Sequence, residues 1–180
     1  MRPIGAKWWR EYGLTGTLCL SLALMSCASF STAAGGTAAN ADSISIDGAV
    51  EHPRSLTRAE LINLPATTEA VSLKTGKGVL TGRYTGVLLW TLLQQASIKV
   101  SAEHRNDAMR HTIVVTSSDG YSTVLSVAEI DPEFGDERAI IAYAKDGQPL
   151  SDKRGFARLI LPADRSAGRA ISGVARITVR

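Results

Sequence analysis

Two basic segments carry the side chains best suited to hold an anionic group. In the first, Arg165 and Arg169 flank Ser166 and Gly168 in a short loop. Arginine forks and the backbone N–H groups of glycine-rich turns are good phosphate donors. The same loop also fits a plain β-turn, in which Asp164 and Gly168 set the backbone and both arginines are solvated. The residue types leave both interpretations open.

The second segment is Lys74-Thr75-Gly76-Lys77-Gly78, a doubly basic turn. It lacks the spacing and the following helix of a phosphate-binding P-loop, so a hairpin connection is the simpler interpretation. Tyr121 follows another turn, Asp119-Gly120. It either begins the next strand or, as an aromatic residue with a polar end, stacks on or hydrogen-bonds a ligand.

Other residue patterns argue against several kinds of chemistry. His52, His104 and His111 are too far apart for the close spacing that marks a zinc site. No G-x-S-x-G motif of a serine hydrolase is present. Glu129 and Asp131 lie where a helix cap and a proline turn need them, which favours a structural role over an acid/base pair. The net charge of +3 includes the basic N-terminal residues, so the remainder is near neutral and a nucleic-acid partner is not indicated.

The N-terminal region has the pattern of a bacterial signal peptide. Arg2, Lys7 and Arg10 precede an apolar run over 14–25, and small-residue sites suitable for cleavage follow it. Residues 1–41 are therefore predicted to be a signal peptide and linker, and 42–180 a single exported, periplasmic domain. Alternatively, Cys27 ends a lipobox and anchors a lipoprotein. Both cysteines, Cys19 and Cys27, lie within 1–41, so the predicted domain contains no thiol.

Apolar periodicity and turn residues predict an α+β fold with mixed or antiparallel sheets and a few short helices. Thr57 with Glu60, and Ser126 with Glu129, have the spacing of helix capping boxes. The expected strands cover 43–47, 70–73, 79–84, 111–116, 121–125, 139–143, 157–161 and 174–179, and the expected helices 58–63, 87–95 and 126–130.

Five short motifs resemble, in order, those of the oxidoreductase molybdopterin-binding domain, the fold of sulfite oxidase. They are YTGVLLWTLL at 84–93, SDGYS at 118–122, AEIDP at 128–132, DGQPL at 146–150 and LILP at 159–162. The resemblance extends over about 44–179, nearly the whole predicted domain. It implies the sulfite oxidase-type fold and a molybdopterin cofactor, with 162–169 as a loop near that cofactor.

This resemblance also locates a departure from the family. In its catalytic members a cysteine before the aromatic-x-Gly motif binds molybdenum, and the equivalent position here is Lys74. A lysine ammonium donates hydrogen bonds and cannot replace a thiolate ligand. No molybdenum is therefore expected through a cysteine, and no catalytic or metal-binding residue is assigned. A pterin-binding part could remain, with Lys74, Tyr121, Arg165, Ser166 and Arg169 as its cofactor-binding residues.

Three functions are consistent with the sequence. The first is a binding module for molybdopterin, another pterin or a small anionic ligand, without standard molybdenum-thiolate catalysis. The second is an active molybdopterin-dependent oxidoreductase with unusual metal ligation. The third is a periplasmic interaction or scaffold protein that meets a periplasmic or membrane redox partner.

Overall fold

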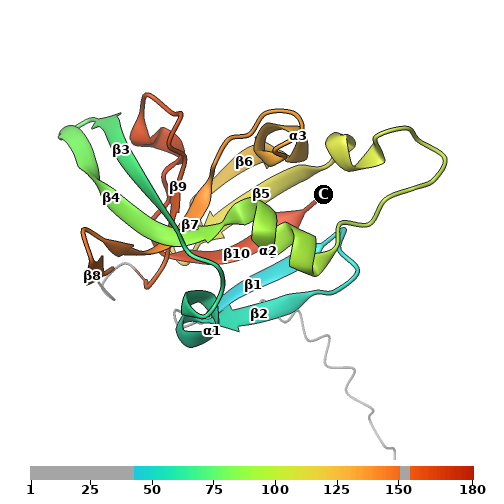
Figure 1. The fold of residues 1–180 in the computed structure, drawn as a ribbon, viewed down its shortest axis with the longest axis horizontal. Helices are drawn as coiled ribbons and strands as arrows, with labels where there is room; N and C mark the ends of the chain where they lie inside the picture. The colour runs from blue at the N-terminus through green and yellow to red at the C-terminus, as the bar shows by residue number, and fades with distance from the viewer. Residues whose placement is uncertain (1–42, 151–154) are drawn as a thin grey trace, which may run out of the picture. The chain divides into compact units, whose positions relative to one another are not determined.

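The protein is built from two mixed or antiparallel β-sheets and a few short helices, as a computed structural model shows (Figure 1). The structure describes residues 43–150 and 155–180. These residues belong to one compact unit, Thr37–Arg180. The α+β prediction is confirmed, whereas the signal peptide and lipobox predictions fall outside the described residues. No helix within the described part is long and apolar enough to cross a membrane.

The first sheet joins both ends of the described chain. Its order is β2 (Arg54–Thr57), β1 (Ser43–Gly48), β10 (Val174–Val179), β5 (Thr112–Ser117) and β6 (Ser122–Ser126). Strands β1 and β10 are parallel, with Ser45 opposite Arg176, and the other pairs are antiparallel. The predicted hairpin around Asp119-Gly120 is present as β5–β6.

The second sheet is dominated by a long hairpin. It contains β3 (Thr67–Thr75), β4 (Gly78–Leu88), β7 (Ile140–Lys145) and β8 (Gln148–Pro149), with β9 (Arg158–Ile160) also paired to β7. The β3–β4 tip is closed by Thr75, whose Oγ1 donates to the carbonyl oxygen of Gly78 at 2.9 Å. Its glycines have open space around them, so the tip projects from the sheet.

Short helices begin where the sequence places caps. Helix α1 (Arg58–Ile62) and helix α3 (Val127–Ile130) both start with the predicted capping boxes. Helix α2 (Leu89–Ala96) begins two residues later than expected, because Val87 and Leu88 belong to β4. Two 3₁₀ turns, η1 (Asp107–Arg110) and η3 (Ala167–Arg169), complete the described helices.

Two hydrophobic clusters hold these elements together. The larger lies around the first sheet and includes Ile44, Leu92 and Ile177, all fully buried. The smaller lies on the second sheet and contains Val71, Leu73, Tyr84, Ile140, Ala142 and Ile160. Ala167 and Ala170 pack against this smaller cluster. Because burial of apolar surface is the main stabilising force of such packing, it fixes η3 to the sheet.

Candidate functional site

The loop over residues 161–172 is the structural centre of the candidate site. It leaves β9 at Leu161, whose carbonyl oxygen accepts from the amide of Asp164 at 3.3 Å. It then forms η3, closed by a bond from the amide of Ala170 to the carbonyl oxygen of Ala167 at 3.1 Å. Three of the five predicted cofactor-binding residues, Arg165, Ser166 and Arg169, lie in this loop. A fourth, Lys74, lies on β3 and is hydrogen-bonded to the loop's main chain.

Lys74, Arg165 and Ser166 meet at the end of β3. The amide of Lys74 donates to the carbonyl oxygen of Arg165 at 3.0 Å, and Ser166 Oγ donates to the carbonyl oxygen of Lys74 at 3.3 Å. Ser166 also forms a short parallel bridge with Lys74. These contacts use backbone atoms of both basic residues and leave their charged ends exposed.

Tyr121 reaches the other side of the same loop. Its hydroxyl donates to the carbonyl oxygen of Gly168 at 2.9 Å, and 56% of the residue is exposed. Its amide donates to Asp119 Oδ1 at 3.0 Å, and the Ser117 hydroxyl donates to the same oxygen. These two hydrogen bonds, the Ser117 bond foremost, lower the pKa of the Asp119 carboxyl. Asp119 therefore carries a negative charge beside Tyr121 at neutral pH.

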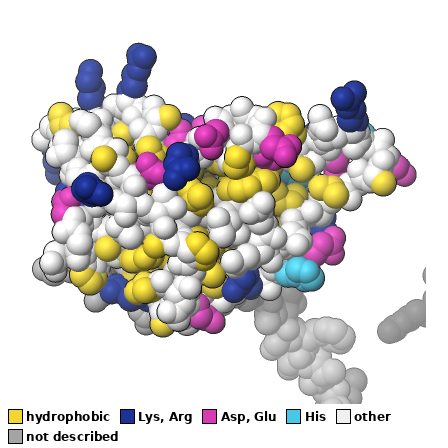
Figure 2. Space-filling view, viewed as in Figure 1, with side chains coloured by type: hydrophobic (Ala, Val, Ile, Leu, Met, Phe, Trp, Pro, Cys, Tyr) yellow, Lys and Arg dark blue, Asp and Glu magenta, His cyan; other side chains and the backbone are white. Residues whose placement is uncertain are grey.

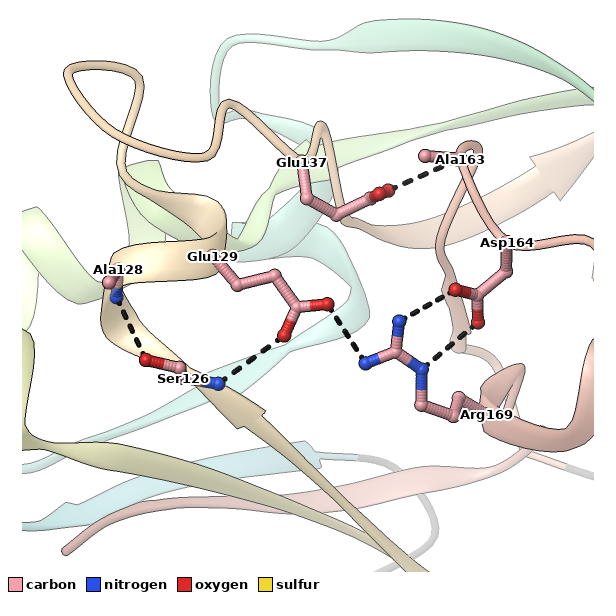
Figure 3. A network of polar contacts seen from close by, with 7 residues as sticks. All are labelled: Ser126, Ala128, Glu129, Glu137, Ala163, Asp164 and Arg169. Carbon is pink, nitrogen blue, oxygen red and sulfur yellow. Dashed lines mark hydrogen bonds and ion pairs between the residues drawn. The ribbon is translucent and has the colours of Figure 1, made fainter.

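Arg169 is engaged by two carboxylates (Figure 3). Its Nη2 and Nε donate to Asp164 at 2.6 and 3.0 Å, and its Nη1 donates to Glu129 Oε1 at 2.9 Å. Hydrogen bonding to Asp164 is the largest cause of the raised pKa of Arg169. The sequence interpretation in which both arginines are solvated is therefore wrong for Arg169. The Arg169 guanidinium therefore links the loop to helix α3, which contains Glu129.

Glu129 and Glu137 complete this polar network. Glu129 Oε2 accepts from the amide of Ser126 at 3.4 Å, so one carboxylate caps α3 and binds Arg169. Glu137 Oε1 accepts from the amide of Ala163 at 3.4 Å (Figure 3). Burial is the largest cause of the raised pKa of Glu137, and the nearby charges of Asp164 and Glu129 raise it further.

The pH dependence of stability should report the cost of ionising Glu137. A carboxyl with a raised folded-state pKa contributes stability below its ordinary value of 4.5, and this contribution is lost as pH rises through the raised pKa. Glu137→Gln should therefore lose less stability than the wild type between pH 4.5 and neutral pH. Urea unfolding across this range measures the difference. Glu133→Gln, at an exposed position, is the control and should keep the wild-type profile; identical profiles for all three proteins would contradict the prediction.

A pocket of about 550 Å³ opens between the loop and the β5–β6 turn. Residues 117–119 and Tyr121 line one side, and 167–168 and 170–172 line the other. Only Tyr121 among the five predicted residues lines it. Lys74 and Arg165 lie on the β3 side of the loop, and Arg169 is turned to its carboxylates. Among the described residues that line it, the polar groups are therefore hydroxyl groups, backbone and Asp119, and none is a lysine or arginine.

Sequence reasoning missed the serines of this pocket. Ser117 and Ser118 adjoin the predicted Asp119-Gly120 turn, and that turn was the one local signal for their position. Ser172 gave no comparable signal. Ser172 lies at the pocket because the returning chain runs beside β9, and there Ser172 forms an antiparallel bridge with Arg158.

The residues present do not supply the thiolate that holds molybdenum in the catalytic families. Neither of the described segments, 43–150 and 155–180, contains a cysteine. Within the same segments, no group of three or more His, Cys, Asp or Glu side chains is arranged to hold a metal ion. Position 74 offers an exposed ammonium and two hydrogen-bonded backbone groups. This donor set does not fit a soft, thiolate-bound metal.

Comparisons with known proteins agree with this fold. The chain matches the family described as the oxidoreductase molybdopterin binding domain over residues 35–180. Its structure is similar to that of the sulfane dehydrogenase SoxCD from Paracoccus pantotrophus, with a TM-score of 0.61 and 19% sequence identity. The match covers 76% of this chain but only 37% of the SoxCD chain, so it shows a shared fold. No curated protein matches the chain. With its whole described region inside the family match, this protein belongs to the oxidoreductase molybdopterin-binding domain family.

Proposed function

We propose that this protein is a binding module that holds a pterin-like ring and does not perform molybdenum-thiolate catalysis. The observation that carries the proposal is the lining of the pocket, where an exposed tyrosine ring adjoins a carboxylate and several hydroxyl groups. A pterin is flat and carries amino and ring N–H donors on one edge. A tyrosine face can stack on such a ring, while carboxylate and hydroxyl oxygens accept from its edge.

A free inorganic anion is a poorer candidate for this pocket. Asp119 lines it as a negative charge, and no described residue of its lining is a lysine or arginine. An anion placed there would be repelled without a compensating partner. For this reason we favour a neutral, donor-rich ring over the small-anion alternative.

Titration with neopterin, followed by its fluorescence, tests the pocket. Because stacking of a flat ring on an aromatic side chain contributes about 1–3 kcal/mol, Tyr121→Ala should weaken binding by about 5- to 150-fold. Tyr121→Phe keeps the ring and loses only the bond to Gly168, so it should bind within a few-fold of wild type. Absence of saturable binding by the wild type would rule out the pterin proposal. Equal affinities for wild type and Tyr121→Ala would place binding elsewhere.

Metal analysis tests the proposed lack of molybdenum catalysis. The protein purified from a host that makes molybdenum cofactor should contain far less than one molybdenum per chain, because no described side chain supplies a thiolate. A bacterial sulfite oxidase-type enzyme from the same host serves as the positive control for cofactor supply. Stoichiometric molybdenum in the present protein would favour the alternative of an oxidoreductase with unusual ligation.

The predicted signal peptide supports a further part of the proposal, namely action after export to the periplasm. N-terminal sequencing of the protein recovered from a periplasmic fraction should begin between residues 34 and 42. A product beginning at an acylated Cys27 would support the lipoprotein alternative.

A further inference from the structure

A cluster of exposed cations lies at the free end of the β3–β4 hairpin, outside the pocket. Lys74, Lys77, Arg83 and Arg165 are all exposed. In the described part of the chain, none of their side chains forms an ion pair, whereas Arg138, Arg169 and Arg176 each do. Figure 2 shows Lys and Arg side chains, in dark blue, standing out from the end of the molecule where Figure 1 places this hairpin.

The strand register explains why these cations share one surface. Lys74 pairs with Val79, and Ala70 pairs with Arg83. Because side chains alternate along a strand, Lys74, Val79 and Arg83 point to one face, opposite to the fully buried Leu73. Arg165 is held beside Lys74 by the backbone bond between them. We call Lys74, Lys77, Arg83 and Arg165 the basic hairpin face.

Among the described residues, nearby acids do not neutralise this face. Asp146 is the neighbouring carboxylate, and its Oδ1 accepts from the amide of Arg83 at 2.8 Å. Its other oxygen lies 4.0 Å from Lys145 Nζ, so a separate cation balances that charge. The four side chains of the basic hairpin face therefore present a net positive charge to a partner.

We propose that the basic hairpin face docks on an anionic phospholipid surface. Stable protein interfaces are centred on large aromatic or arginine anchors seated in pockets. Between its cations this face instead has small side chains, Ala70, Ser72 and Thr81, and one exposed valine, Val79. Binding to a planar layer of negative headgroups needs no such pocket, because each lysine or arginine near the surface contributes independently. The projecting tip also lets several cations reach one plane together.

This proposal goes beyond ligand binding and does not depend on it. The basic hairpin face and the pocket lie on opposite sides of the 161–172 loop, and they have no side chain in common. The test uses the unit Thr37–Arg180, which contains both sheets and both hydrophobic clusters. Residues 1–36 are omitted because their apolar run would itself bind lipid.

Co-sedimentation with vesicles tests the proposal. We expect binding to vesicles of equal parts phosphatidylglycerol and phosphatidylcholine, and none to pure phosphatidylcholine. Raising NaCl from about 50 to about 500 mM should release the protein, because salt screens exposed charges. The triple variant Lys74→Gln, Lys77→Gln, Arg165→Gln should bind about 100-fold more weakly, since each of the three cations contributes about fivefold. Its melting temperature should stay unchanged. The hydrogen bonds that join Lys74 to Arg165 and Ser166 use only backbone atoms of Lys74 and Arg165, so none of the removed charged groups takes part in them.

A matched triple variant separates local docking from total charge. Lys99→Gln, Arg105→Gln, Arg180→Gln removes three exposed cations that lie outside the hairpin. It should bind within about threefold of wild type. Equal losses in the two triple variants would overturn the proposal, as would equal binding to both vesicle types or absence of binding by the wild type. A neopterin result for Tyr121→Ala remains informative in every case, so failure here is distinguishable from failure of the proposed function.

Discussion

Replacing Gly86 with alanine is expected to prevent stable folding of the domain. A Cβ at this position would lie 2.3 Å from the carbonyl oxygen of Ile141 and 2.5 Å from the Cα of Ala142. Both are backbone atoms of β7 and cannot rotate away. Relief of the clash would require β4 and β7 to separate at the register shift between Thr85 and Gly86. A cost above about 4 kcal/mol is expected, which is a large part of the stability of an ordinary domain.

Soluble yield and urea unfolding measure this effect. Gly76→Ala is the matched control, because no atom lies within 4 Å of a Cβ built there. That variant should unfold within about 0.5 kcal/mol of wild type, as surface substitutions usually do. A Gly86→Ala protein with a near-normal urea midpoint would show that the two strands can part at little cost. The glycine of the YTG motif is thus explained by strand packing, without any appeal to a cofactor.

Replacing Arg169 with alanine should produce the second largest loss. It would leave Asp164 and Glu129 without their shared cation. Asp164 is 18% exposed and Arg169 is 35% exposed, so the interaction lies between a surface ion pair and a buried one. Surface pairs contribute up to about 1 kcal/mol, whereas breaking a buried pair costs about 3–5 kcal/mol. We therefore expect a loss of about 2 kcal/mol for Arg169→Ala.

Thermal unfolding tests the Arg169 prediction by comparing three variants. Arg169→Lys should recover part of the loss, because it restores the charge but not the two-point contact with Asp164. Arg165→Ala, in the same loop, should stay within about 0.5 kcal/mol of wild type, because its guanidinium is exposed and its loop contact is a backbone bond. If Arg165→Ala and Arg169→Ala were equally destabilised, the clamp between the loop and α3 would not explain the effect. Neopterin affinity should also fall in Arg169→Ala, because η3 forms one wall of the pocket.

Local signals explain most of what the sequence predicted correctly. The two capping boxes depend on residues three positions apart, and both are present as predicted. The hairpin at Asp119-Gly120 is likewise a short-range pattern. The motif order then supplied the family and the sulfite oxidase-type fold, which the family match confirms. These predictions needed no knowledge of distant contacts.

Distant pairing explains most of the errors. The expected strands at 70–73 and 79–84 are longer in the structure. Strands β3 and β4 pair from Thr67 opposite Gly86 to Thr75 opposite Gly78, and β4 continues to Leu88 by pairing with β7. Strand β2 had no clear local pattern and is present because it pairs with β1. In the same way, Arg169 meets Glu129 across 40 positions, a partnership that neither local sequence reveals. The assignment of Lys74, Tyr121, Arg165, Ser166 and Arg169 to cofactor binding stays a prediction.

The place of β10 in the first sheet constrains the order in which the domain can fold. This strand is the most C-terminal one described, yet it lies between β1 and β5. Thr178 Oγ1, for example, donates to Asp47 Oδ1 across 131 positions. During synthesis from the N-terminus, β1 and β2 must wait for almost the entire domain before their sheet can close. Such long-range contacts also slow folding. A chain that cannot complete its core until β10 has been made therefore remains incompletely folded through most of its synthesis.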